Sequence, residues 1–288
     1  MRLAFLGTPA AAVPPLEALL AAGHDVRLVV SQPDRKRGRG GALVPSPVKV
    51  AALAHDVPVT DRVDDVLAAG VELGVVVAFG KLIKAHVLAE VPMVNLHFSL
   101  LPRWRGAAPV ERAILAGDAE TGVCLMALDP GLDTGPVHEC ARTPIRPEEH
   151  VDDLRSRLVD IGTRLLVEAL DRGVGEPVPQ QGEPTYAAKI DPAELELDLT
   201  QPAEVVHRTV RLGRAWTTFR GARLQVVAAR PQEQGPATGT IADLVIGCGG
   251  GTGLELLTVK PEGRAAQPAA AWRNGARPRP GEPVGRGA

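Results

Sequence analysis

The sequence predicts an α/β protein in two parts: a mostly parallel sheet covered by helices, and then a smaller all-β domain, a barrel or a sandwich. Strand-like apolar runs alternate with helical segments up to about residue 170, which is the element order of a parallel sheet. A Pro-, Gly- and Gln-rich segment follows, and beyond it the strand-like pieces are short and separated by turns. The length of 288 residues suits roughly two domains.

In the first part, a strand over residues 2–7 precedes a helix that contains Leu16, Leu19 and Leu20 and ends at Gly23. Residues 32–47, QPDRKRGRGGALVPSP, form a loop by their Pro, Gly and charges. The remaining strands are apolar rather than alternating, as buried parallel strands are. We expect strands over 26–31, 71–79, 94–98 and 122–128, and helices over 48–55, 106–117 and 151–170.

The second part begins after residues 174–189, VGEPVPQQGEPTYAAK, which have the composition of a linker. One helix is predicted over 202–212. The strand-like pieces WTTF, RLQVVAA, GTIADLVI and LELLTV follow, and residues 275–288 are Gly-, Pro- and Arg-rich and are expected to fray. GCGGGTG at residues 247–253 precedes a strand rather than a helix, so we interpret it as a hairpin loop and not as a dinucleotide fingerprint.

Composition excludes several classes of protein. The three cysteines lie far apart, which excludes a disulfide framework and a Cys-rich zinc site and favours a reducing, cytoplasmic compartment. No apolar run approaches the roughly 18 residues of a membrane span, and Gly7, Pro9, Pro14 and Pro15 interrupt the N-terminal run that a signal peptide would need. The histidines have no metal-ligand spacing, and no P-loop or HExxH motif is present, so we expect no metal.

The net charge of −2 conceals an asymmetry between the two parts of the chain. Residues 201–288 carry 12 Lys and Arg against 6 Asp and Glu, a net +6, whereas residues 1–200 carry a net −8. A basic C-terminal third suggests a polyanionic partner, although an Arg-rich composition alone explains it equally well. Arg208, Arg211 and Arg214 have helical spacing and form either a basic stripe or a solvated helix face.

A candidate active site lies at the carboxyl ends of the predicted strands, where ligands bind in open α/β sheets. Asn95 and His97, two residues apart in one strand, point to the same face, and Asp133 follows the strand that ends near Leu128. His97 titrates near neutrality, a carboxylate such as Asp133 would orient it, and Asn95 can donate to an oxyanion. These residues suit acyl or formyl transfer. The alternatives are that His97 is a hydrogen-bonded core residue and that Asp133 only caps a turn.

The segment from Asn95 to Val137, which includes SLLPRWRGAAP and ends in DPGLDTGPV, resembles the core of the methionyl-tRNA formyltransferase family. The resemblance extends to FLGTPAAAVPPLEALLAAGHDV, to SQPDRKRGRGGALVPSPVKVAA and to VVVAFGKLI. It covers residues 2–170 closely and 190–264 by layout only.

The resemblance implies a Rossmann-type catalytic domain over 1–174, a linker over 175–189 and an OB-like tRNA-binding domain over 190–288. It implies 10-formyltetrahydrofolate as co-substrate, initiator methionyl-tRNA as acceptor and a monomer. It assigns catalysis to Asn95, His97 and Asp133. The folate contacts it implies are Ser99, Leu100, Leu101, Pro102, Ala78, Phe79 and Gly80.

The resemblance also implies that the loop from Arg35 to Gly41 approaches the tRNA acceptor end and that the basic C-terminal domain holds the tRNA backbone. The expected tRNA contacts are Arg35, Lys36, Arg37, Arg39, Arg208 and Arg211. Three other functions stay open: formylation of an amino-sugar nucleotide, RNA binding by an inactive relative, and a dinucleotide-dependent oxidoreductase. The basic loop and C-terminal domain disfavour an amino-sugar acceptor. The presence of Asn95, His97 and Asp133 disfavours an inactive relative, and the lack of GxGxxG after residues 2–7 disfavours an oxidoreductase.

Overall fold

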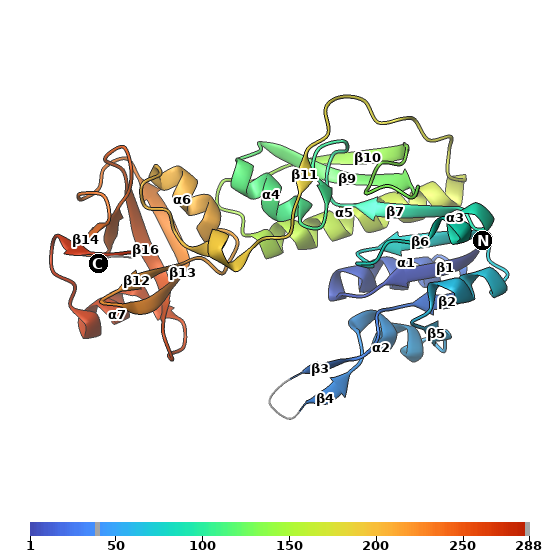
Figure 1. The fold of residues 1–288 in the computed structure, drawn as a ribbon, viewed down its shortest axis with the longest axis horizontal. Helices are drawn as coiled ribbons and strands as arrows, with labels where there is room; N and C mark the ends of the chain where they lie inside the picture. Colours follow the sequence, from blue (N-terminus) through green and yellow to red (C-terminus); the bar gives the residue numbers. More distant parts are fainter. Residues whose placement is uncertain (38–40, 286–288) are drawn as a thin grey trace. The chain divides into compact units, whose positions relative to one another are not determined.

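The computed structural model describes residues 1–37 and 41–285, and it divides the chain into two units (Figure 1). Unit 1 comprises residues 1–110, 120–144 and 154–188. Unit 2 comprises residues 111–119, 145–153 and 189–288.

Unit 1 is built on a seven-stranded sheet in the order β10-β9-β7-β6-β1-β2-β5. The pairs from β7 through β5 are all parallel, whereas β9 and β10 are antiparallel to their neighbours. The mostly parallel α/β sheet is therefore confirmed, with an antiparallel edge that the sequence did not reveal. The strands are β1 (Arg2–Gly7), β2 (Asp25–Val30), β5 (Val59–Thr60), β6 (Leu73–Val77), β7 (Met93–His97), β9 (Glu120–Ala127) and β10 (Val137–Pro144).

Apolar residues fill both faces of this sheet, which explains why most strands are apolar rather than alternating. In β1, Leu3, Ala4, Phe5 and Leu6 are all fully buried. Gly162 lets a long helix approach the sheet closely, because a Cβ there would lie 3.0 Å from a methyl group of Val123. The helices and 3-10 turns beside or after the strands are η1 (Ala10–Ala12), α1 (Val13–Ala21), α2 (Pro47–Ala54), η2 (Val63–Ala68), α3 (Ala85–Glu90), α4 (Pro109–Ala116) and α5 (Val151–Arg172).

Unit 2 contains the small barrel that the short strands predicted. Its antiparallel sheet runs in the order β12-β13-β16-β15-β14-β18, and a bridge between Phe219 and Val284 brings the two ends of the order together (Figure 1). The elements are η3 (Pro192–Leu195), α6 (Ala203–Val210), β12 (Trp216–Phe219), β13 (Ala222–Gln232), β14 (Thr240–Ala242), β15 (Val245–Gly247), β16 (Gly253–Pro261), β17 (Gln267–Pro268), α7 (Ala269–Ala276) and β18 (Glu282–Pro283).

Two glycine-rich segments of unit 2 are ordered by this barrel. The GCGGGTG segment is the turn between β15 and β16, with Gly250 and Gly251 at positive φ, as a hairpin requires. The tail that we expected to fray from about residue 275 is instead held through residue 285. The N–H of Val284 donates to the Gly239 carbonyl at 2.8 Å, and Val284 is only 5% exposed.

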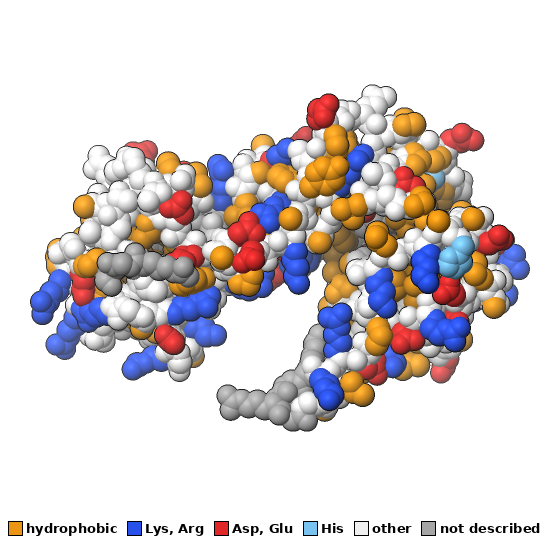
Figure 2. Space-filling view, in the orientation of Figure 1, with side chains coloured by type: hydrophobic (Ala, Val, Ile, Leu, Met, Phe, Trp, Pro, Cys, Tyr) orange, Lys and Arg blue, Asp and Glu red, His pale blue; other side chains and the backbone are white. Residues whose placement is uncertain are grey.

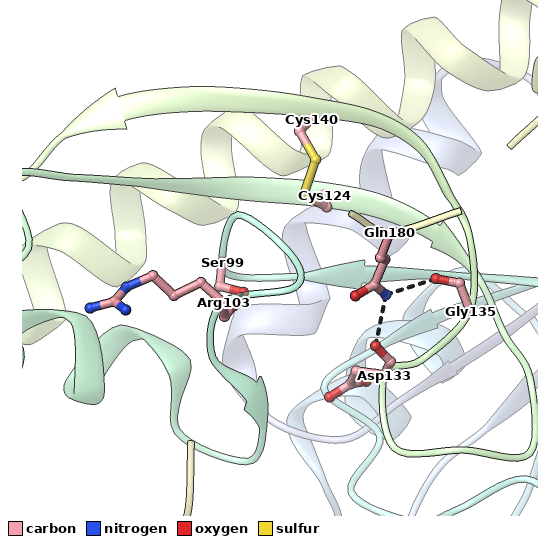
Figure 3. The surroundings of a disulfide bond; sticks show 7 residues. All are labelled: Ser99, Arg103, Cys124, Asp133, Gly135, Cys140 and Gln180. Carbon is pink, nitrogen blue, oxygen red and sulfur yellow. Dashed lines mark hydrogen bonds between the residues drawn. A yellow bond between two sulfur atoms is a disulfide. The ribbon is translucent and has the colours of Figure 1, made fainter. Parts of the chain in front are cut away.

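Two short pairings and one disulfide complete the fold of the described residues. β3 (Arg35–Arg37) and β4 (Ala42–Val44) make a hairpin out of the predicted loop. β8 (Arg105–Gly106) pairs with β11 (Tyr186–Ala187). A disulfide joins Cys124 of β9 to Cys140 of β10, directly opposite each other in the ladder (Figure 3). The spacing of the cysteines predicted no disulfide framework and favoured a reducing compartment. The antiparallel pairing at this edge nevertheless brings two cysteines 16 positions apart in the chain together in one disulfide.

In the part of the chain that is described, no helix has both the length and the apolarity that crossing a membrane requires.

Candidate active site

A cavity of about 450 Å³ opens in unit 1 beside the carboxyl ends of β6 and β7, where the rule for open α/β sheets places a ligand. Asn95, His97 and Asp133 all line it. The structure therefore brings together the three residues that the sequence picked out. Most of the remaining wall is apolar, which is typical of sites that hold a small organic ligand.

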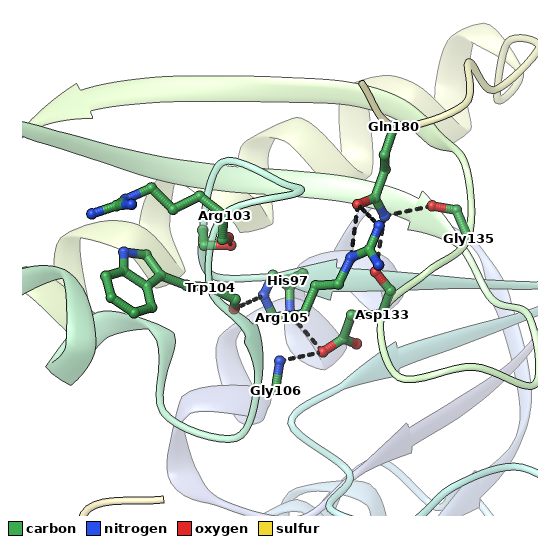
Figure 4. Close-up of polar contacts among 9 residues, drawn as sticks. His97, Arg103, Trp104, Arg105, Gly106, Asp133, Gly135 and Gln180 are labelled. Carbon is green, nitrogen blue, oxygen red and sulfur yellow. Dashed lines mark hydrogen bonds and ion pairs between the residues drawn. The ribbon is translucent and has the colours of Figure 1, made fainter. Parts of the chain in front are cut away.

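His97 is the last residue of β7, and each of its ring nitrogen atoms has a polar neighbour. Nε2 lies 2.9 Å from the Trp104 carbonyl oxygen, and Nδ1 lies 3.5 Å from Oδ2 of Asp133 (Figure 4). A carbonyl only accepts hydrogen bonds, so we assign the proton of the neutral ring to Nε2. The lone pair of Nδ1 then faces the carboxylate, and Nδ1 is the atom that can take up a second proton.

The surroundings of His97 favour its neutral form. The residue is 5% exposed, and this burial lowers the pKa of the imidazole below its ordinary value, while Asp133 and the Trp104 carbonyl act in the opposite direction. A neutral imidazole beside a carboxylate is suited to accept a proton and to be stabilised once it has done so.

Asp133 projects from a tight turn in the loop between β9 and β10. Its backbone has φ 51, and its Oδ2 accepts the N–H of Gly106 at 2.8 Å. Asp129 supports the turn by accepting from the N–H of Gly131 at 3.0 Å and from the Thr134 hydroxyl at 2.6 Å. Both aspartates line the cavity, but Asp129 is the one that caps the turn, whereas Asp133 is the one that faces His97.

The seven residues expected to contact folate are not all at the cavity. Ala78, Phe79 and Gly80 line it, with Ala78 at φ 47 and Gly80 at φ 77. Ser99, Leu100, Leu101 and Pro102 are not among its lining residues.

Ser99 instead has a place in the internal bonding of its loop. Its buried hydroxyl donates to the Arg103 carbonyl at 2.5 Å (Figure 3 shows both residues). Leu100 packs where β9 has Gly122, since a Cβ at Gly122 would lie 2.5 Å from a Leu100 methyl carbon. Ser99 and Leu100 therefore make contacts within the protein, and folate contact by the SLLP segment stays a prediction.

The basic loop is a hairpin with a well-defined base. Arg35 and Lys36 are exposed on β3, Arg37 completes that strand, and Arg39 lies outside the described residues. Ser46 caps α2 by accepting the N–H of Lys49 at 3.0 Å, and its hydroxyl lies 2.5 Å from that of Ser31. Lys49 also pairs with Asp34 at 2.9 Å. These contacts give the SPVK sequence a physical role in closing the hairpin's base.

The two arginines proposed on α6 differ sharply from each other. Arg208 is half-buried, and its guanidinium lies over Gly117 and donates to the Ala116 carbonyl at 3.3 Å. Arg211 is 6% exposed and donates to the carbonyls of Glu149 and Arg146 at 2.9 Å each. Arg211 is therefore a buried structural residue and offers no surface to a phosphate, so we remove it from the expected tRNA contacts.

Exposed positive charge in unit 2 lies mainly on the barrel. Figure 2 shows Lys and Arg side chains gathered over it, and Arg220, Arg223 and Arg230 are exposed there. Arg220 is paired with Glu282 at 2.6 Å, so it contributes less net charge than the other two.

The sequence analysis missed the residues that support the candidate site. Trp104, Arg105 and Gly106 contact or flank His97 and Asp133, and Gln180 bonds to the Asp133 loop from the segment expected to be a linker (Figure 4). Trp104 and Arg105 belong to the SLLPRWRGAAP segment that carried the resemblance, and this position was the signal that could have identified them. No composition signal distinguishes Gln180 from the polar residues around it.

Comparison with known proteins agrees with this geometry. The formyl transferase family model matches residues 1–170, and the model of the formyl transferase C-terminal domain matches residues 189–277. A methionyl-tRNA formyltransferase of Ruegeria pomeroyi is 44% identical over 93% of this chain and 95% of its own length. One from Thermus thermophilus is 44% identical over 99% of both chains.

Solved structures share the fold at lower identity. An N-formyltransferase of Helicobacter canadensis, in complex with folinic acid and dTDP-3-aminofucose, has a TM-score of 0.70 at 18% identity, over 88% of this chain and 98% of its own. Methionyl-tRNA formyltransferase from Clostridium thermocellum has a TM-score of 0.60 at 16% identity, over 80% and 93%. With both domain models matched in order and the relatives covered almost end to end, the chain belongs to the formyl transferase family, among its methionyl-tRNA formyltransferases.

Proposed function

We propose that this protein transfers the formyl group of 10-formyltetrahydrofolate to the α-amine of methionyl initiator tRNA. The observation that carries the proposal is His97 at the cavity wall, with Nε2 bound to the Trp104 carbonyl and Nδ1 facing Asp133. The names of the relatives supply methionyl-tRNA as the acceptor and formyl transfer as the reaction. The complex of one structural neighbour with folinic acid supports a folate as the donor. Translation initiation then places the protein in the cytoplasm.

The cavity has the properties that a reduced folate requires. Its volume of about 450 Å³ and largely apolar wall suit a flat heterocycle, and Asn95, His97 and Asp133 are among its polar lining residues. The turned backbone at Ala78 and Gly80 would hold the pterin edge. The donor would supply an electrophilic formyl carbon attached to a nitrogen leaving group.

The chain's own residues then have distinct roles. The Asn95 amide donates to the carbonyl oxygen as negative charge develops on it. His97 takes the proton of the attacking amine at Nδ1 and returns it to the departing nitrogen. Asp133 stabilises the imidazolium between these two transfers. One carbon–nitrogen bond forms, one breaks, and the proton balance closes within the site.

The tRNA would be held by charge outside the cavity. Exposed Arg35 and Lys36 on the hairpin and Arg223 and Arg230 on the barrel can contact phosphates. Binding through such contacts should weaken steeply as salt concentration rises, because counterions are released from the nucleic acid.

A transfer assay with three acceptors tests the proposal. Purified protein and 10-formyltetrahydrofolate are combined with methionyl initiator tRNA, methionyl elongator tRNA or an amino-sugar nucleotide. We expect formylation of the initiator tRNA in preference to the other two. Transfer to the sugar alone would keep the site and overturn the acceptor, and no transfer at all would overturn the proposed function.

A further inference from the structure

We propose that Gln180 is a positioning residue that fixes Asp133 against His97; this inference rests on the proposed formyl transfer. Gln180 lies between the two matched family domains, in a segment whose composition is that of a linker. It does not line the cavity, so it would act through the residues that do.

All the hydrogen-bonding capacity of the Gln180 amide is directed at the site. Nε2 donates to the Asp133 carbonyl at 2.9 Å and to the Gly135 carbonyl at 2.8 Å (Figure 3). Oε1 accepts from Nη2 and Nε of Arg105, at 2.7 and 3.1 Å (Figure 4). Carbonyls only accept and guanidinium only donates, so these partners dictate a single orientation of the amide.

The first pair of bonds holds the turn that carries the Asp133 carboxylate. Asp133 has φ 51, a conformation that residues with a Cβ adopt at a cost. The turn is also closely packed, since a Cβ at Gly135 would lie 1.9 Å from the Ala127 carbonyl oxygen. Holding the carbonyls of residues 133 and 135 fixes the backbone on both sides of Thr134, and with it the direction of the carboxylate.

The two bonds from Arg105 hold the loop on the other side of His97. Arg105 lies between Trp104, whose carbonyl accepts from His97, and Gly106, whose N–H donates to Asp133. One amide therefore ties together the two loops that contact the imidazole. A shift of either loop changes the 3.5 Å separation between His97 and Asp133.

Gln180 is itself held in place on both sides along the chain. Val178 and Val137 exchange two backbone hydrogen bonds of 2.8 Å each. On the other side, the Thr185 hydroxyl accepts the N–H of Trp104 at 2.9 Å, and β11 pairs with β8. Residues 178–187, which we call the strap, are thus anchored on both sides of Gln180, and this anchoring holds its side chain in position within unit 1.

The test compares Gln180→Ala and Gln180→Glu with the control Gln181→Ala, which changes an exposed neighbour. The glutamate retains the acceptor for Arg105 but has no hydrogen to donate to the two carbonyls when it is ionised. Three quantities are measured: kcat and KM for formyl transfer, melting temperature, and the titration of the His97 ring by NMR without substrate.

We expect kcat to fall about tenfold or more in both Gln180 variants, with KM for tRNA nearly unchanged, because misplaced groups mainly raise the barrier. The His97 titration should move to lower pH, since the carboxylate that opposes the effect of burial is less well placed. The Gln181→Ala protein should match the wild type in all three measurements.

Three results would overturn the inference. They are wild-type kcat and titration in Gln180→Ala, wild-type behaviour of Gln180→Glu beside an impaired Gln180→Ala, and a loss of kcat that leaves the His97 titration unmoved. Absence of transfer by the wild type would count against the proposed function instead, and the NMR titration would still decide the role of Gln180.

Discussion

Replacing Asp133 by Asn tests the proposed proton transfer most directly, because the change preserves shape and removes one charge. An asparagine oxygen can still accept the N–H of Gly106, which Oδ2 of Asp133 accepts at 2.8 Å. That oxygen also takes the place of the atom nearest His97, because the same Oδ2 lies 3.5 Å from Nδ1, and the amide nitrogen replaces Oδ1. The variant therefore keeps the local shape and loses the counter-ion of the imidazolium.

The size of the effect follows from the separation of the two groups. Unit charges 3.5 Å apart attract by about 5 kcal/mol at an effective dielectric constant of about 20. This attraction is absent while His97 is neutral, so its loss falls almost entirely on the transition state. Since about 1.4 kcal/mol is a factor of ten, kcat should fall on the order of 10³-fold.

The assay is single-turnover formylation of methionyl initiator tRNA at saturating formyl donor, together with the tRNA affinity of each protein. Affinity should be unchanged, because Asp133 lies in the cavity and away from the basic hairpin. Asp160→Asn, the same substitution on an exposed position of α5, should have wild-type rates. A loss of less than tenfold in Asp133→Asn would refute the assignment of Nδ1 as the proton acceptor.

Three further predictions concern pH, salt and packing. Burial lowers the pKa of both His97 and His207, so these two residues bind fewer protons in the folded protein than in the unfolded chain as the pH falls below about 6.5. Acid therefore stabilises the unfolded chain, and the melting temperature should fall between pH 7.5 and 5.5. Replacing Arg35 and Lys36 together by Gln should reduce the slope of log affinity for tRNA against log salt by up to about 2. Gly122→Ala should destabilise the fold by about 2 kcal/mol or more, because the added Cβ would lie 2.2 Å from the carbonyl of the paired β10 strand.

Each of these predictions has its own control and contrary outcome. His207→Gln should make the melting temperature less sensitive to pH, and a melting temperature that is flat from pH 7.5 to 5.5 would contradict the assigned directions. An unchanged salt slope, with only folate binding affected, would show that the hairpin does not face tRNA. Gly175→Ala, where no atom lies within 4 Å of the added Cβ, should leave stability unchanged; equal effects at Gly122 and Gly175 would refute the packing argument.

Asn95 and His97 of the candidate site were predictable because both lie in one strand. In a buried strand, Asn95 and His97 are the polar exceptions, and their spacing puts them on one face. The prediction of Asp133 assumed that the strand before it was parallel, so that the carboxyl-end rule applied. β9 is antiparallel to β7, and its end at Ala127 pairs with Val94 near the start of β7. The path of the loop brings Asp133 back to His97, and strand direction did not predict that path.

Arg211 shows where local periodicity fails. With Arg208 and Arg214 it has the spacing of a solvated helix face, but α6 ends at Val210. Beyond the last helical residue the spacing no longer determines direction, and Arg211 turns inward to two carbonyls that precede α5 in the chain. An arginine donates up to five hydrogen bonds, so free backbone acceptors can outweigh exposure to water.

The strap that holds Gln180 shows a second limit, which concerns backbone pairing. Pro and Gly lower the local preference for helix and strand, and residues 174–189 contain no apolar run, so they have the composition of a linker. Yet their N–H and C=O groups pair with Val137 and with β8, and such pairing depends on which strand edges are unpaired nearby. The amino-acid composition of a segment does not indicate whether an unpaired strand edge lies near it. The segment between the two matched family domains thus makes defined contacts despite a linker's composition, and Gln180 is the residue at which the effect of those contacts on formyl transfer can be measured.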